Sequence, residues 1–307
     1  MDLRGNGLIA MADEAERPTR WWLGWIVAFV ILAGVGGIGQ GIGFLALGKP
    51  DHDDVRYQYI EGFMFGATVL GLWAWLRFKE RRPLSSLGFR RHRAIPRFLL
   101  GVLAGSTMIT VVVLVLLATG DYDTGMSDHT RTGTGAVLLL LPLAALFVVQ
   151  ASTEESLTRG YMLQVAGRQL PGWAAILGAS VFFAVVHLEF HPLTLTNLIL
   201  FALFASFLAL AQRSLWLVCG IHASWNFAMG NLYGVPVSGN PEAVSLLGIG
   251  PGPASSSTLT GGDFGPEGGI VATAVWLCAA IASYLYYRRS VRRVGSSSGV
   301  AELASNA

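Results

Sequence analysis

The sequence predicts an all-α, polytopic membrane protein of about eight transmembrane helices that enclose a polar cavity. Two observations predict this fold class. The chain of 307 residues is 53% hydrophobic and only 13% charged, about half the charged fraction of an average soluble domain. Its apolar residues also gather in runs of about 20, the length of helix that crosses a bilayer.

The apolar runs place the spans near residues 21–47, 58–76, 98–119, 136–158, 173–190, 193–211, 214–233 and 269–287. The first and third spans are rich in glycine, and small residues of this kind permit close helix packing in lipid. The sixth and seventh spans are separated by a few residues around Arg213, which predicts a tight helical hairpin. Cys219 and Cys278 both fall within apolar runs, so no disulfide framework is expected.

The spans divide the chain into six parts. These are a cytoplasmic N-terminal segment (1–20), the first three helices (21–134), a core of helices four to seven (135–233), an extracytoplasmic loop rich in Gly, Pro and Ser (234–268), the eighth helix (269–287) and a cytoplasmic tail (288–307). The first 20 residues are polar and mixed in charge, unlike a cleavable signal peptide, so the first span is expected to remain as an anchor.

The distribution of Lys and Arg sets the expected orientation. With both termini in the cytoplasm, the outer segments hold only three of the 21 basic residues, which are Lys49, Arg56 and Arg131. This assignment follows the positive-inside rule for a protein of the plasma (inner) membrane. The basic segment 77–97 lacks the interleaved aromatic residues of a nucleic-acid platform, so no nucleic-acid partner is expected.

Charged residues at the end of the fourth span are the most informative feature of the chain. Glu154, Glu155 and Arg159 follow an apolar run, where a charge costs from about 3 to more than 10 kcal/mol depending on the method. Glu155 and Arg159 have the i, i+4 spacing of a favourable ion pair. Since neighbouring helix positions point about 100° apart, Glu154 is expected to face a cavity and Glu155 to face Arg159.

Two later spans carry polar partners for Glu154. His187 ends the segment that begins at Phe183, and His222 precedes Asn226 by four residues. His222 and Asn226 therefore share one helix face. At 1.5 Å per residue, all three spans place their polar groups about 13–20 Å below the inner surface. The polar side chains of these three spans are therefore expected to lie at the same depth in the membrane and to meet.

The residue types suggest hydrolysis of a peptide bond. A buried glutamate beside a histidine can take a proton from water, which assigns water activation to Glu154 with His187. His222 and Asn226 would then donate hydrogen bonds to the developing oxyanion. No serine, cysteine or threonine nucleophile is placed by motif.

The motifs Glu-Glu-x-x-x-Arg (154–159), Phe-x-x-x-His (183–187) and His-x-x-x-Asn (222–226) together resemble the CPBP family of intramembrane endopeptidases. These are the CAAX prenyl protease type II and bacteriocin-processing, Abi-like proteins. The resemblance covers residues 136–232 and implies an eight-helix fold with a cavity open to the cytoplasm. It also implies a glutamic rather than a metallo mechanism.

Each motif residue takes a role from this resemblance. Glu154, His187, His222 and Asn226 become catalytic, and Glu155, Arg159 and Phe183 become structural support of the site. The expected partners are membrane lipids and a membrane-associated protein or peptide cleaved near its C-terminus, with a prenylated substrate as one option.

Two alternatives stay open at this point. Zinc is one: Glu154, His187 and His222 are ligand types for this ion, although His187-Leu-Glu189-Phe-His191 misses the zincin His-Glu-x-x-His spacing by one residue. The other is a non-catalytic scaffold, an immunity-type protein or a transporter subunit that uses the polar cluster for packing or ion passage. The chain has no internal repeat of the kind many transporters show. The sequence does not indicate an oligomeric state.

Overall fold

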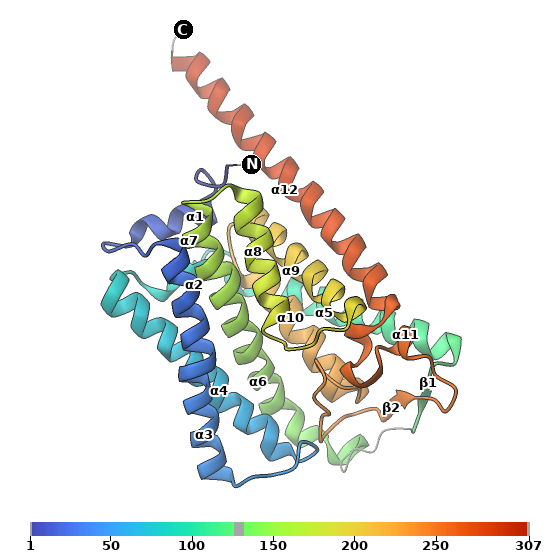
Figure 1. The fold of residues 1–307 in the computed structure, drawn as a ribbon. Coiled ribbons are helices and arrows are strands. Elements are labelled where there is room, and N and C mark those ends of the chain that lie inside the picture. The colour runs from blue at the N-terminus through green and yellow to red at the C-terminus, as the bar shows by residue number, and fades with distance from the viewer. Residues whose placement is uncertain (1, 126–131, 306–307) are drawn as a thin grey trace.

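A computed structural model describes residues 2–125 and 132–305 of the chain. That part of the molecule is a bundle of helices with one small two-stranded sheet (Figure 1). The all-α, polytopic fold class is therefore confirmed. Residues 1, 126–131 and 306–307 lie outside the described residues, and with them Arg131 and the end of the predicted tail.

Helices occupy the positions of all eight predicted spans. They are α2 and α3 (Trp21–Val30, Gly36–Leu47), α4 (Val55–Ala74), α5 (Ala94–Thr119), α6 and α7 (Val137–Glu155, Leu163–Gly167), α8 (Gly172–Val185), α9 (Pro192–Gln212), α10 (Trp216–Phe227) and α12 (Ile270–Ser305). Six of these segments are long and apolar enough to cross a membrane, and α8 and α10 are not among them. The chain is a multi-pass membrane protein.

The two ends of the bundle differ in what they carry. The N-terminus, the short helix α1 (Gly7–Ala10) and the far end of α12 lie at one end, and the small sheet lies toward the other (Figure 1). In that sheet β1 (Tyr122–Thr124) pairs antiparallel with β2 (Ile249–Pro251), with Tyr122 opposite Pro251. This arrangement puts the middle of the loop 234–268 next to the end of α5.

Glycines bring α5 and α10 into close contact, as the small residues of the third span suggested. A Cβ atom on Gly105 would lie 2.2 Å from the main-chain oxygen of Ile221, and one on Gly101 would lie 2.3 Å from that of Leu217. On the other helix, a Cβ on Gly220 would lie 2.2 Å from the oxygen of Phe98. Only glycine permits this approach, which holds the helix carrying His222 and Asn226 against α5.

The helix of the fifth predicted span, α8, is shorter than the predicted range 173–190. It ends at Val185, and His187 lies in the turn that follows. The His187 ring accounts for part of this ending, because its Nδ1 lies 2.7 Å from the main-chain oxygen of Phe183 and satisfies a carbonyl of the last turn. Leu188 then adopts a φ of +57°, which reverses the chain. Pro192 starts α9 at a position that favours proline.

The loop 234–268 is largely irregular, as predicted, but it also folds onto the helices. It contains β2, the short helix α11 (Ser257–Thr260) and two single turns. The Asn231 side chain donates to the main-chain oxygen of Val244, and the Asn197 side chain donates to those of Glu267 and Gly269. These hydrogen bonds from polar side chains of the bundle give the loop a defined position.

Glu242 is an acidic side chain that this loop buries. It is 2% exposed, and its Oε2 has no hydrogen-bond partner within the described residues. Burial raises the pKa of Glu242 well above its ordinary value, and the charge of Glu61 raises it further. A buried carboxyl in this setting favours its protonated form.

Replacing Glu242 by glutamine is expected to raise the melting temperature at pH 8 and to leave it nearly unchanged at pH 4, below the unfolded pKa. Because the folded-state pKa lies above the unfolded value of about 4.3, wild-type stability is greatest at low pH and falls as the pH rises through the folded-state pKa. Glutamine removes that loss. Thermal unfolding in detergent at both pH values measures the difference. Asp263→Asn, an exposed change in the same loop, is the control, and an equal shift in both variants would contradict the prediction.

Candidate active site

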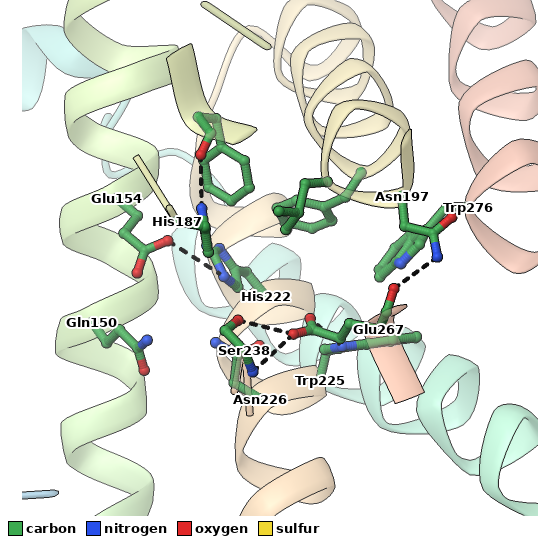
Figure 2. A pocket seen from close by; sticks show the side chains of 13 residues that line it. Gln150, Glu154, His187, Asn197, His222, Trp225, Asn226, Ser238, Glu267 and Trp276 are labelled. Atoms are coloured by element: carbon green, nitrogen blue, oxygen red, sulfur yellow. Dashed lines mark hydrogen bonds and ion pairs between the residues drawn. The ribbon is translucent and has the colours of Figure 1, made fainter. Parts of the chain in front are cut away.

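A small polar cavity lies between α6, α9 and α10 (Figure 2). Glu154, His187, His222 and Asn226 all line it. Its volume is about 20 Å³, and a cavity needs roughly 10–15 Å³ on this measure to hold one water molecule. The structure thus brings the polar groups of three separate motifs around a space that fits a single water.

Glu155 and Arg159 form the ion pair that their spacing predicted. Arg159 Nη1 lies 3.0 Å from Glu155 Oε1, and the side chains are 1% and 0% exposed. The guanidinium also lies over the rings of Phe183 and Phe201, at 4.5 and 5.4 Å from their centroids, a favourable position for a cation. These contacts explain how an arginine is accommodated inside the bundle.

The helix widens where it carries these charges. Residues Ser156–Met162 form a π-helical segment between α6 and α7, a feature that often marks functional sites. Every residue of that segment is buried. The helix of the fourth predicted span, made of α6, the π-helical segment and α7, therefore continues to Gly167, beyond the predicted end at 158. Glu154 lies well inside it.

His222 lies between the two glutamates. Its Nδ1 is 2.9 Å from Glu155 Oε1, and its Nε2 is 3.8 Å from Glu154 Oε2. The first distance is a hydrogen bond, in which Nδ1–H donates to the carboxylate that also pairs with Arg159. The second distance is too long for a direct hydrogen bond, and a water molecule can bridge the two atoms at such a separation. Sequence reasoning did not foresee the contact between Glu155 and His222.

His187 presents its other ring nitrogen to the cavity. Because Nδ1 bonds the Phe183 carbonyl at 2.7 Å, that nitrogen carries the hydrogen, and Nε2 of the neutral ring is an acceptor. The ring also packs against Phe183, with centroids 4.7 Å apart. Phe183 thus supports the imidazole through its backbone and its ring.

Asn226 brings an unused polar group to the site. The residue is 3% exposed, and its Oδ1 has no hydrogen-bond partner among the residues described. An unsatisfied buried group of this kind costs about 1–3 kcal/mol. An amide oxygen kept in this state on a cavity wall is suited to accepting a hydrogen bond from a ligand or a water molecule.

Other residues of the cavity were not singled out from the sequence. They are Gln150, Asn197, Leu198, Phe201, Trp225, Ser238, Glu267 and Trp276. Gln150 and Asn197 are polar residues within apolar spans, so the cost of burying them could have flagged both. The same holds for Glu61 on α4. Ser238 and Glu267 belong to the irregular loop, where the sequence offers no signal of a place in the site.

A larger cavity adjoins the small one. Its volume is about 530 Å³, and Gln150, Glu154, Phe183, His187 and Ser238 line both spaces. The rest of its wall is mainly apolar and includes Phe29, Leu32, Met64, Phe65, Leu157, Phe182 and Val186. Glu154 therefore stands where a space for one water meets a space large enough for an organic chain.

The residues considered for zinc do not form a metal-binding group in the described part of the chain. Across residues 2–125 and 132–305, no group of three or more His, Cys, Asp or Glu side chains is placed to hold a metal ion. Glu154, His187 and His222, the set considered for zinc, share the cavity without converging in that way.

The fold and the site define a multi-pass membrane protein with a partly buried carboxylate, two imidazoles and a carboxamide around one cavity. Residues 136–228 match the protein-family model described as Type II CAAX prenyl endopeptidase Rce1-like. The match contains all three motifs, so the predicted resemblance is confirmed over this range. It supports a CAAX-type intramembrane endopeptidase acting on a membrane-associated protein. Comparison with curated proteins and with solved structures found no match.

Proposed function

We propose that this protein is a glutamic intramembrane endopeptidase that cleaves near the C-terminus of a membrane-associated, lipid-bearing protein. One observation carries the proposal: Glu154, His187, His222 and Asn226 surround a cavity for one water at the edge of a large apolar cavity. A carboxylate and an imidazole can activate that water. A second imidazole and the side-chain N–H of Asn226 can donate hydrogen bonds to the negative charge that its attack creates.

Glu154 acts as the general base in this proposal. Its carboxylate takes one proton of the water, while Nε2 of His187 accepts a hydrogen bond from the other and orients it. The water oxygen then forms a bond to the carbonyl carbon of the peptide. General-base catalysis of this kind contributes about 10²–10⁴-fold to rate.

His222 and Asn226 bind the oxyanion that results. Asn226 donates from its amide nitrogen. His222 donates from Nε2 in its doubly protonated form, since Glu155 already accepts from Nδ1, and the nearby carboxylates of Glu154 and Glu155 favour the positive charge of the ring. When the tetrahedral intermediate collapses, the C–N bond breaks and the proton held by Glu154 passes to the leaving amine.

The apolar cavity suits a substrate that carries a prenyl chain. A hydrophobic chain lying among Phe29, Leu32 and Met64 gains about 25 cal/mol for each Å² removed from water. Its attached peptide would reach the shared wall at Glu154 and His187. The family description, a CAAX prenyl endopeptidase, supports the same substrate class. We place both termini in the cytoplasm of the plasma membrane, from which such a C-terminus would enter.

The function is tested by cleavage of quenched peptides with the purified protein in detergent. Prenylated C-terminal peptides are expected to be cleaved, and their non-prenylated counterparts at least about ten-fold more slowly because they lack the buried chain. A strong zinc chelator is expected to leave the rate unchanged, since the proposed steps use side chains alone. Restoration of a chelator-sensitive rate by added zinc would contradict the glutamic mechanism, and failure of every peptide would contradict the substrate class.

A further inference from the structure

Glu267 reaches the cavity from the loop 234–268, outside the residues that match the family model. It lies in a single turn, Pro266–Gly268, just before α12 begins. Figure 2 shows it beside Ser238, Trp225 and Asn226 on the wall of the small cavity. The proposed mechanism does not use this carboxylate.

Glu267 joins three parts of the chain. Its Oε1 accepts a hydrogen bond from Trp225 Nε1 at 2.9 Å, and its Oε2 accepts from Ser238 Oγ at 2.9 Å and Ser238 N at 3.2 Å. Its main-chain oxygen accepts from the Asn197 side chain at 2.7 Å. The residue thereby connects α10, the beginning of the loop and α9, and hydrogen bonds to a carboxylate are among the stronger ones.

Trp225 links Glu267 to the helix that carries the site. It lies one residue before Asn226 and three after His222 on α10, and it is 1% exposed. Its ring packs on Trp276 of α12, with centroids 4.3 Å apart. The hydrogen bond to Glu267 fixes the indole in this position. It therefore also limits rotation of the turn that presents His222 and Asn226.

The hydrogen bonds of Glu267 argue against direct contact with substrate. Both carboxylate oxygens already accept hydrogen bonds from protein groups, whereas Asn226 keeps a free oxygen. Because its carboxylate bonds only protein groups, Glu267 is suited to hold Trp225 and Ser238 in place. The loop residues that it holds, Ser238 and Glu267 itself, form one side of the cavity wall.

We propose that Glu267 is a positioning residue that clamps the loop 234–268 across one side of the small cavity and fixes Trp225 beside His222 and Asn226. The loop is thus a part of the active site. The effect on catalysis rests on the proposed function, but the closure of the cavity does not.

Closure is tested by thiol labelling, which needs no activity. Leu198 lines the small cavity and Met64 lines only the large one. Each is replaced by cysteine in a background lacking Cys219 and Cys278, and a membrane-impermeant maleimide is added to the purified protein. Glu267→Gln is expected to raise the labelling rate at position 198 about ten-fold or more, as expected for loss of hydrogen bonds to a charged group. The rate at position 64 should not change, and Asp263→Asn should change neither.

Positioning is tested by peptide cleavage in a double-mutant cycle. Glu267→Gln and Trp225→Phe, which removes the indole N–H, are each expected to lower kcat about ten-fold, with KM changed less than two-fold. The double variant is expected to match the single ones, since both changes remove one interaction. Trp173→Phe, at an exposed tryptophan, controls for the loss of an indole.

Two results would overturn the clamp: an unchanged labelling rate at position 198, or losses in kcat that multiply to about 100-fold in the double variant. If Glu267→Gln does not fold, Ser238→Ala and Trp225→Phe, which each remove one donor, provide the same labelling comparison. If the wild-type protein cleaves no peptide, the proposed function fails and the labelling result alone decides on the clamp.

Discussion

Replacing Glu154 by glutamine is expected to lower kcat for peptide cleavage by about 10²–10⁴-fold, the range that a general base contributes. Glutamine has nearly the same size and shape as glutamate but cannot take a proton from water. The Glu154 side chain is 16% exposed, and its nearest charged partner, His222 Nε2, is 3.8 Å away. The exchange therefore breaks no direct hydrogen bond to His222, and the melting temperature should stay close to that of the wild type.

The matched control for this variant is Glu189→Gln. Glu189 lies in the turn between α8 and α9, and its Oε1 accepts a hydrogen bond from the His191 main-chain N–H outside both cavities. This variant should cleave peptide within about two-fold of the wild-type rate, as for most surface changes. Steady-state kinetics with one prenylated peptide compares the three proteins. A Glu154→Gln protein that keeps more than a tenth of wild-type kcat would exclude Glu154 as the base.

Replacing Arg159 by methionine is expected to lower the free energy of unfolding by about 3–5 kcal/mol, the usual cost of removing one partner of a buried ion pair. Arg159 and Glu155 are 1% and 0% exposed, so the remaining carboxylate would lose its counterion inside the bundle. Methionine keeps much of the volume of the side chain. Denaturant titration in detergent micelles, followed by tryptophan fluorescence, measures the change.

A second variant separates the unpaired charge from lost packing. Glu155→Gln combined with Arg159→Met removes both charges, and it is expected to be more stable than Arg159→Met alone because no unpaired carboxylate remains. Arg77→Met, at an exposed arginine near the end of the second span, should change stability by no more than about 0.5 kcal/mol. If Arg159→Met resembles Arg77→Met, the buried pair does not stabilise the fold.

The fold class and the order of helices followed from the sequence because bilayer length and hydropathy act locally. Each apolar run indicates its own helix without reference to the others. The positions of the helix ends depended on other interactions. In α8, the contact of the His187 ring with the Phe183 carbonyl contributes to the end of the helix at Val185, and hydropathy does not report this contact.

The candidate site divides in the same way. Helical spacing alone predicted that Glu155 would pair with Arg159 and that Glu154 would face elsewhere, and the structure contains that ion pair. The contact between His222 Nδ1 and Glu155 joins residues 67 positions apart. Such a contact depends on how α6 and α10 pack, which the sequence pattern does not specify.

The sequence by itself determined that carboxylate and imidazole side chains lie inside an apolar bundle. Because burying such a group without a partner costs free energy, the sequence also indicated that these groups meet one another. That argument needs only residue type and the length of each apolar run. Tertiary structure alone decided which groups share the cavity, how much space separates Glu154 from His222 and that Glu267 lines one side of it. Those features arise from a glycine-mediated helix contact and from a loop without hydrophobic periodicity, so only the folded chain brings them together.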